Sequence, residues 1–143
     1  MGFNLSSNVK ITIGAATVNG TSDVQSPVID MKGFDSVLFV TTFATPAAGN
    51  FVQANQDTVV GMGTAADLLA SKATPAGASD ETCWLEIVRP SKRFVRATFK
   101  RGTSSVLGEV YAIQSLAAAE PQTNVLAATS IGKLLVSPAE GTP

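Results

Sequence analysis

The sequence predicts an all-β protein: a jelly-roll-like β-sandwich with one short helix and extended terminal arms. Short segments of alternating or continuous apolar residues recur along the chain, and glycine and proline separate them. Of the 143 residues, 45% are hydrophobic, which is enough for a core. Short strands with turn residues between them are typical of sandwiches and barrels. A chain of this size forms one domain, so we expect a single domain over residues 1–143, with arms at residues 1–8 and 117–143.

The first predicted strands lie in the first third of the chain. Residues 9–13 alternate between apolar and polar side chains, which is strand spacing. Asn19-Gly20 is the strongest two-residue hairpin signal in the chain, and a second strand is expected over residues 26–31. Residues 34–43 are β-branched and aromatic and are apolar on both faces in the middle. This pattern is typical of a central strand that is covered on both sides.

The middle of the chain is predicted to contain the helix. A short strand is expected over residues 51–55. Thr64 is a suitable N-cap for a short helix over residues 64–72. Asp67 would then lie in the first turn of that helix, where the helix dipole favours an anion. Residues 74–80 are rich in proline, glycine and polar residues, and they predict a loop.

The second half has the clearest strand pattern. Residues 83–88 form a predicted strand that ends before Pro90. Residues 94–100 alternate cleanly, with the apolar side chains inward and the charged side chains outward. A polar turn at residues 101–105 then leads into a long strand over residues 106–115. These last two strands are expected to form one hairpin.

The composition argues against catalysis. The chain has no histidine and one cysteine, so it contains neither a Ser-His-Asp triad nor a cysteine zinc site. Cys83 has no histidine to activate it and is expected to be a small buried hydrophobe. Trp84, the one tryptophan, is suited to the core or to an interface, and the core is the preferred prediction. We therefore predict a protein that is not an enzyme and has no catalytic, cofactor-binding or metal-binding residues.

The charge pattern bears on partners and location. The formal net charge is −1, and charged residues make up only 15% of the chain. A globally basic nucleic-acid binder is therefore not expected. No signal peptide and no stretch near the roughly 18 apolar residues of a membrane span is found, so no membrane partner is expected. A surface this poor in charge favours assembly, and we expect a homodimer that covers exposed strand edges.

Six of the ten basic residues fall within thirteen positions, and these are the candidate partner-binding residues: Arg89, Lys92, Arg93, Arg96, Lys100 and Arg101. They are suited to contact the carboxylates of a protein partner. The alternative is a solvated strand face beside a turn. Nucleic acid is disfavoured, because no interleaved aromatic stacking platform accompanies the charges.

Two runs in the chain resemble a known family. The run GFDSVLFV at residues 33–40 and the run LEIVRPSKRFVRA at residues 85–97, with its continuation to residues 111–113, are similar to segments of the capsid cement, or decoration, proteins of tailed bacteriophages. The resemblance covers residues 28–115 and has moderately specific motifs. The apolar stretch at residues 124–136 lies outside it.

The resemblance implies a jelly-roll structural protein of the virion. Such a protein is made in the bacterial host cytoplasm, binds the outer surface of an icosahedral head and clamps neighbouring subunits of the major capsid protein. The basic hairpin of the family corresponds to residues 89–101 here, and the family brings no catalytic motif. Two alternatives remain open: another head-completion or tail protein, and a carbohydrate-binding jelly-roll module that would use Phe51, Asn55 and Asp57.

Overall fold

The fold is given by a computed structural model, which describes residues 5–15, 18–45, 47, 49–77, 79–101 and 105–117. These residues form one short helix and eleven strands: α1 (Leu5–Asn8), β1 (Lys10–Ala15), β2 (Val18–Gly20), β3 (Val24–Gln25), β4 (Ile29–Asp30), β5 (Phe34–Thr45), β6 (Phe51–Asp57), β7 (Ala66–Asp67), β8 (Glu81–Val88), β9 (Phe94–Lys100), β10 (Ser105–Leu107) and β11 (Val110–Ala117).

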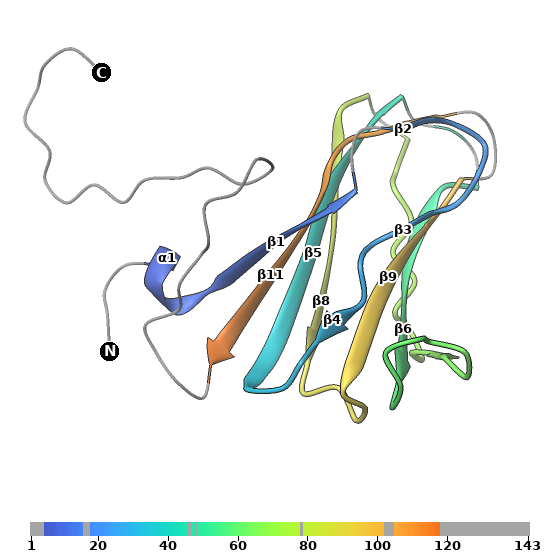
Figure 1. The fold of residues 1–143 in the computed structure, drawn as a ribbon. Coiled ribbons are helices and arrows are strands. Elements are labelled where there is room, and N and C mark those ends of the chain that lie inside the picture. The colour runs from blue at the N-terminus through green and yellow to red at the C-terminus, as the bar shows by residue number, and fades with distance from the viewer. Residues whose placement is uncertain are drawn as a thin grey trace, which may run out of the picture.

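The strands form two antiparallel sheets that face each other (Figure 1). In sheet A the order is β1-β11-β5-β10-β2, and β8 pairs with the other edge of β5. In sheet B the order is β3-β9-β6-β7, and β4 also pairs with β9. The predicted β-sandwich is therefore confirmed.

The core lies between the two sheets. Sheet A contributes the fully buried Val37, Phe39 and Phe43, and sheet B contributes Val95 and Phe99. Burial of such side chains provides roughly 1.5–3 kcal/mol each and is the main force that holds the sheets together. The alternation predicted for residues 94–100 is confirmed, since its apolar positions face this core.

The inner face of sheet A is fully covered, whereas its outer face is only partly covered. Val37 and Phe39 are buried, whereas Leu38 and Val40, on the opposite face of β5, are half-buried. The prediction of a central strand is therefore confirmed, while the cover on its outer face is partial rather than complete. Trp84 pairs with Val40 on that same outer face and is 61% exposed, so it is not the core residue that we predicted.

The predicted helix over residues 64–72 is not present. The segment instead contains β7 and turns, because its polar groups pair with β6. Thr64 donates to the Asp57 carboxylate, and the Leu68 N–H donates to the Ala54 carbonyl. Tertiary pairing therefore overrides the local helix signal here. The short helix of this protein is α1, which lies in the predicted N-terminal arm of residues 1–8.

Two predicted hairpins are also absent. Asn19-Gly20 ends β2, which pairs with β10 rather than with the strand that follows it. Strands β9 and β10 lie in different sheets, so they cannot form a hairpin with each other. The predicted hairpin over residues 94–115 was wrong because alternation defines the buried face of a strand but not the sheet to which it belongs.

The other boundaries differ by a few residues. The strand predicted over residues 26–31 is reduced to β4, with β3 before it. The long strand predicted over residues 106–115 is divided into β10 and β11. The predicted C-terminal arm begins at Ala117, the last residue of β11, and residues 118–143 lie outside the described residues. Within the described part of the chain no helix is long and apolar enough to cross a membrane.

Candidate partner-binding surface

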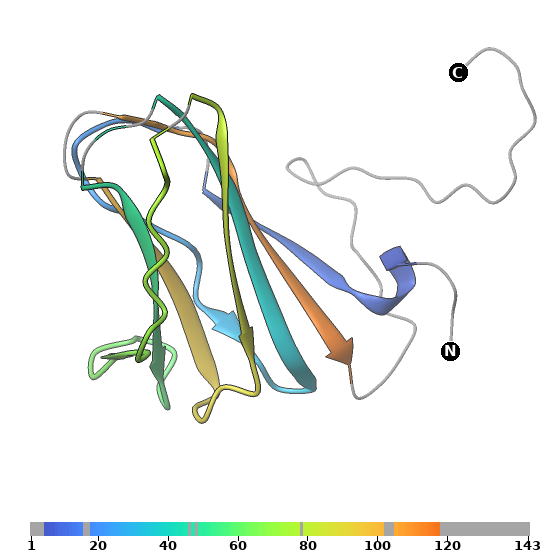
Figure 2. The same ribbon diagram turned by 180° about the vertical axis from the view of Figure 1, so that it is seen from behind.

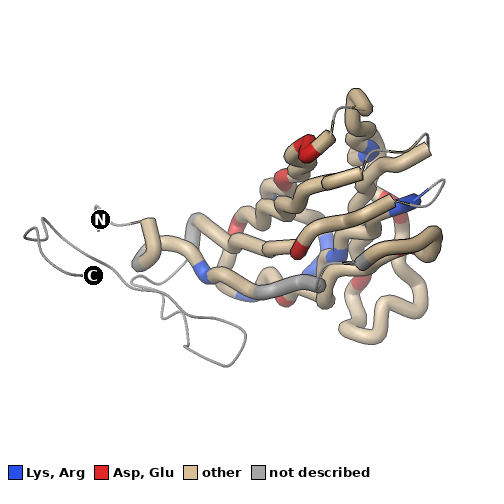
Figure 3. Tube along the Cα trace, turned by 90° about the horizontal axis from the view of Figure 1, so that it is seen from above, with Lys and Arg blue, Asp and Glu red and all other residues tan. Residues whose placement is uncertain are grey.

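The six candidate basic residues do not form one patch. Arg89, Lys92 and Arg93 lie in the loop between β8 and β9, whereas Lys100 and Arg101 lie at the opposite end of β9. A strand rises about 3.3 Å per residue, so the seven residues of β9 separate these groups by about 20 Å. Acidic and basic positions are interspersed over the described chain (Figure 3). A site therefore has to be sought at one end of β9.

Residues 89–93 border a cleft of about 400 Å³ at one end of the sandwich. Its lining brings together two loops that are distant in sequence: Met31, Lys32, Phe34, Asp35, Arg89, Pro90, Ser91, Lys92 and Arg93. Four of these residues are cationic and one is acidic. Lys32 was missed by the sequence prediction because only the pairing of β4 with β9 brings it to this loop. The cleft is suited to an anionic group.

Arg89 is a highly exposed cation of this cleft. Its side chain is 80% exposed, and its Nε lies 3.7 Å from the Asp35 carboxylate, which is a loose ion pair. Its backbone has a φ of 49°, and its N–H donates to the Asp35 carbonyl at 2.6 Å. The backbone is thus fixed while the guanidinium is solvated. Such a group is able to pair with a partner's carboxylate at little internal cost.

Arg93 is already paired within the chain. Its Nε and Nη2 donate to the two Asp30 carboxylate oxygens at 2.8 and 2.6 Å. This hydrogen-bonded pair lowers the pKa of Asp30 to about 2 and raises the pKa of Arg93. The guanidinium also lies 5.0 Å from the centre of the Phe94 ring. Arg93 therefore orders the cleft wall as well as contributing charge to it.

Arg96 lies on the outer face of sheet B, as the alternation predicted. It is half-buried opposite Asn55 of β6. Its Nε is buried and has no hydrogen-bond partner among the described residues. Arg96 is three residues beyond the loop along β9 and does not line the cleft.

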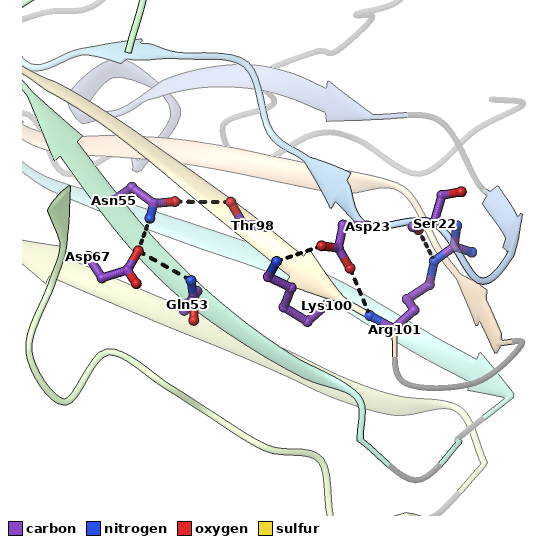
Figure 4. A network of polar contacts seen from close by, with 8 residues as sticks. All are labelled: Ser22, Asp23, Gln53, Asn55, Asp67, Thr98, Lys100 and Arg101. Atoms are coloured by element: carbon purple, nitrogen blue, oxygen red, sulfur yellow. Dashed lines mark hydrogen bonds and ion pairs between the residues drawn. The ribbon is translucent and has the colours of Figure 1, made fainter. Parts of the chain in front are cut away.

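Lys100 and Arg101 bind residues of this chain (Figure 4). Lys100 Nζ lies 2.6 Å from the Asp23 carboxylate, and this hydrogen bond lowers the pKa of Asp23. Arg101 is only 6% exposed. Its Nε donates to the Ser22 carbonyl at 2.6 Å, and its Nη1 donates to the Ser105 carbonyl at 3.1 Å. These contacts stabilise the crossing between the sheets, so both residues have a clear role inside the fold.

The three residues considered for sugar binding also contact other residues of this chain. The Lys72 ammonium lies over the Phe51 ring, with its Nζ 4.1 Å from the ring centre. Asn55 donates to Asp67 and accepts from Thr98 (Figure 4). The fully buried Asp57 accepts from the Thr58 and Thr64 N–H groups at 2.6 and 2.9 Å and orders the loop of residues 58–64. Burial acts to raise the pKa of Asp57, but these donors outweigh it and lower the pKa.

The described residues contain no group of three or more acidic, cysteine or histidine side chains that could hold a metal ion. Cys83 is buried, as predicted, and burial raises the pKa of its thiol to about 11. A thiol with that pKa is a poor nucleophile at neutral pH. The cleft bordered by residues 89–93 is thus the best-defined candidate site.

No protein-family model matches this chain, and no curated protein matches it.

Proposed function

We propose that this protein is a structural virion protein without enzymatic activity. It binds the outside of an icosahedral phage head and clamps neighbouring major capsid subunits. The single observation that supports it best is the cationic cleft at one end of a charge-poor β-sandwich. The cleft lies within the segment that resembles phage cement proteins. The homodimer expected from the sequence is part of this proposal.

The strand order supports a jelly-roll topology. With β8 included, the sheets contain the series β1-β11-β5-β8 and β3-β9-β6-β7. The chain changes sheet at each step from β2 to β3, β4 to β5, β5 to β6, β7 to β8, β8 to β9 and β9 to β10. Two interleaved four-stranded sheets are the arrangement of a jelly roll, a fold common in viral capsid and lectin domains.

The clamp acts by multivalency. A capsid lattice repeats the same acidic groups at many sites, and each bound copy bridges adjacent subunits. A weak contact gains from effective concentration when two or more such contacts form at once. The exposed Arg89 and the half-buried Lys92 provide the charge, and the ordered Arg93–Asp30 pair holds the loop in place.

We expect added protein to raise the temperature or osmotic stress at which its expanded capsid ruptures. A ligand that binds only the assembled shell stabilises that shell by mass action. The measurement compares rupture curves of purified empty heads with and without saturating protein. Identical curves would contradict a cementing role. Sedimentation with tails instead of heads would indicate the head-completion or tail alternative.

We expect the double substitution Arg89→Ala/Lys92→Ala to weaken capsid binding about 30-fold or more, since truncating a desolvated interfacial charge pair costs roughly 2–5 kcal/mol. The fold should survive, because neither side chain is in the core. Sedimentation with capsids at low and moderate salt measures the loss. Lys100→Ala is the matched control, because Lys100 lies at the other end of β9 and pairs with Asp23. Equal binding by the double variant and wild type at both salt concentrations would place the clamp elsewhere.

A further inference from the structure

Strand β8 has one unpaired edge. It pairs with β5 through eight consecutive residues without a bulge, and no strand of the described residues pairs with its other side. Seen from behind, β8 lies at the border of sheet A, and residues 68–77 run between it and β6 (Figure 2). An edge strand presents free N–H and C=O groups that bind any extended chain of suitable sequence.

Two hydrogen bonds define which groups of β8 face this free edge. The Arg89 N–H donates to the Asp35 carbonyl, and on the other side of β5 the Gly108 N–H donates to the Thr42 carbonyl. Backbone groups alternate between the two sides of a strand. Odd-numbered residues of β5 therefore face β8 and even-numbered ones face β10 and β11. In β8 the even-numbered residues direct their N–H and C=O groups outward: Thr82, Trp84, Glu86 and Val88.

The side chains along this edge do not protect it. Proteins usually protect a long edge with lysine, proline or a bulge. Here Trp84 is 61% exposed and Val88 is 56% exposed. The one charge among the four residues is Glu86, which accepts a hydrogen bond from Ser36 Oγ at 2.7 Å. The edge is thus long and regular, and two of its four outer side chains are apolar and exposed, which suits a strand-binding site.

A groove runs beside the edge. Two hollows of about 410 and 370 Å³ lie between β8 and residues 68–75. The first is lined by residues 73–75 and 81–86, and the second extends to Arg89 and the fully exposed Leu69. Each hollow has room for an apolar side chain of an added strand. The backbone edge and the hollows together form an elongated docking site.

We propose that residues 131–137 of this same chain pair with β8 as an additional antiparallel strand of sheet A. This segment has the sequence IGKLLVS, and Lys133 is the one charged residue between positions 121 and 139. If Lys133 lies opposite Glu86, each outer-face residue of β8 has a matching neighbour: Ile131 beside Val88, Lys133 beside Glu86, Leu135 beside Trp84, and Ser137 beside Thr82. Opposite-charge, apolar and hydroxyl cross-strand pairs are each favourable.

The other face of the segment fits the groove. In this register Leu134 and Val136 lie opposite Leu85 and Cys83, over the hollow of about 410 Å³. Gly132 lies opposite Ile87 and adds no side chain there. The proposed strand therefore directs Leu134 and Val136 to the hollow of about 410 Å³ and leaves the second hollow, beside Ile87, without a side chain.

The antiparallel direction follows from where β11 ends. Ala117 pairs with Phe34, and Ser36 pairs with Val88, so β11 ends beside the Val88 end of β8. The path across β5 and β8 to the free edge spans three strand spacings, about 14 Å. The thirteen residues 118–130 reach up to about 43 Å when extended. A parallel strand would have to enter at the far end of the sheet.

Occupation by the same chain is favoured over a second copy. A short tether gives an effective concentration in the millimolar range, far above that of a dilute protein solution. The added strand would close an edge that otherwise invites aggregation. This inference is independent of capsid binding.

Trp84 provides a direct test, because it is the one tryptophan in the chain. Leu135→Asp should shift its emission to the red and raise acrylamide quenching, since the side chain of a directly opposite residue lies about 5 Å from the indole and shields it from solvent. Leu126→Asp, in the same region but outside residues 131–137, is the control and should leave both unchanged. Both variants are made in the full-length chain. Wild-type quenching equal to that of Leu135→Asp would overturn the proposal.

A disulfide tests the register. Val88→Cys/Ile131→Cys should oxidise to an intramolecular disulfide at low protein concentration, because directly paired residues have Cα atoms about 5.5 Å apart. Val88→Cys/Leu135→Cys, which would be adjacent only in a parallel strand, should oxidise far more slowly. The native Cys83 is buried and poorly reactive. Interchain disulfides in place of intramolecular ones would overturn the proposal in favour of a second copy.

Discussion

Replacement of Phe39 by alanine is expected to destabilise the fold by about 3–5 kcal/mol, the usual cost of removing a fully buried phenylalanine side chain. Phe39 is completely buried at the centre of β5, between Leu85 on β8 and Ala112 on β11. Its neighbours belong to paired strands and cannot collapse into the cavity without breaking the ladder. Urea unfolding followed by circular dichroism measures the loss.

The matched control is Leu38→Ala. Leu38 lies next to Phe39 on the opposite, half-exposed face of sheet A. Removing it leaves a partly solvated space, so the loss should be much smaller than that of Phe39→Ala. Equal losses would mean that both faces of β5 are covered, and the outer face of sheet A would then not be a free surface.

The fold class could be predicted because it depends on local pattern. Alternation over residues 94–100 identifies a strand and its buried face, and the apolar run over residues 34–43 identifies the central strand. The prediction of a helix over residues 64–72 was wrong because the hydrogen-bond partners of this segment lie on another strand, β6. Asp57 binds Thr64, and Ala54 pairs with Leu68. Such pairing is a property of the tertiary structure, which a short helix signal does not contain.

Trp84 could have been placed correctly from its own strand. Cys83, Leu85 and Ile87 alternate with Trp84 and Glu86. The face that contains a charged residue is the solvent face, so Glu86 indicates that Trp84 points outward. The core prediction relied on the large aromatic side chain alone. The alternation of the strand indicated the solvent face, and the alternation was right.

The candidate site was predictable only in part. The concentration of basic residues between positions 89 and 101 is real, and residues 89–93 do gather at one cleft. Proximity in sequence did not become proximity in space, because an extended strand carries Lys100 and Arg101 to the other end of the sandwich. Lys32 joins the cleft through long-range pairing of β4 with β9, and no local pattern indicates it.

The different surroundings of Lys100 and Arg101 predict a large difference between the effects of their substitution on the free energy of unfolding. Arg101→Met should destabilise the fold by about 2–4 kcal/mol, because it leaves the Ser22 and Ser105 carbonyls without their charged donor in a buried site. Methionine retains the apolar length of the side chain, so the loss reports the hydrogen bonds rather than a cavity. Thermal and urea unfolding of the purified variant measure it.

Lys100→Met is the comparison for Arg101→Met. The Lys100–Asp23 pair is more than one-third exposed on both sides, and exposed ion pairs contribute about 0–1 kcal/mol. The two substitutions remove the same charge from adjacent positions, so a charged surface patch would respond to both equally. A large loss with Arg101→Met alone identifies a structural arginine. Losses below about 1 kcal/mol in both variants would contradict a structural role for Arg101.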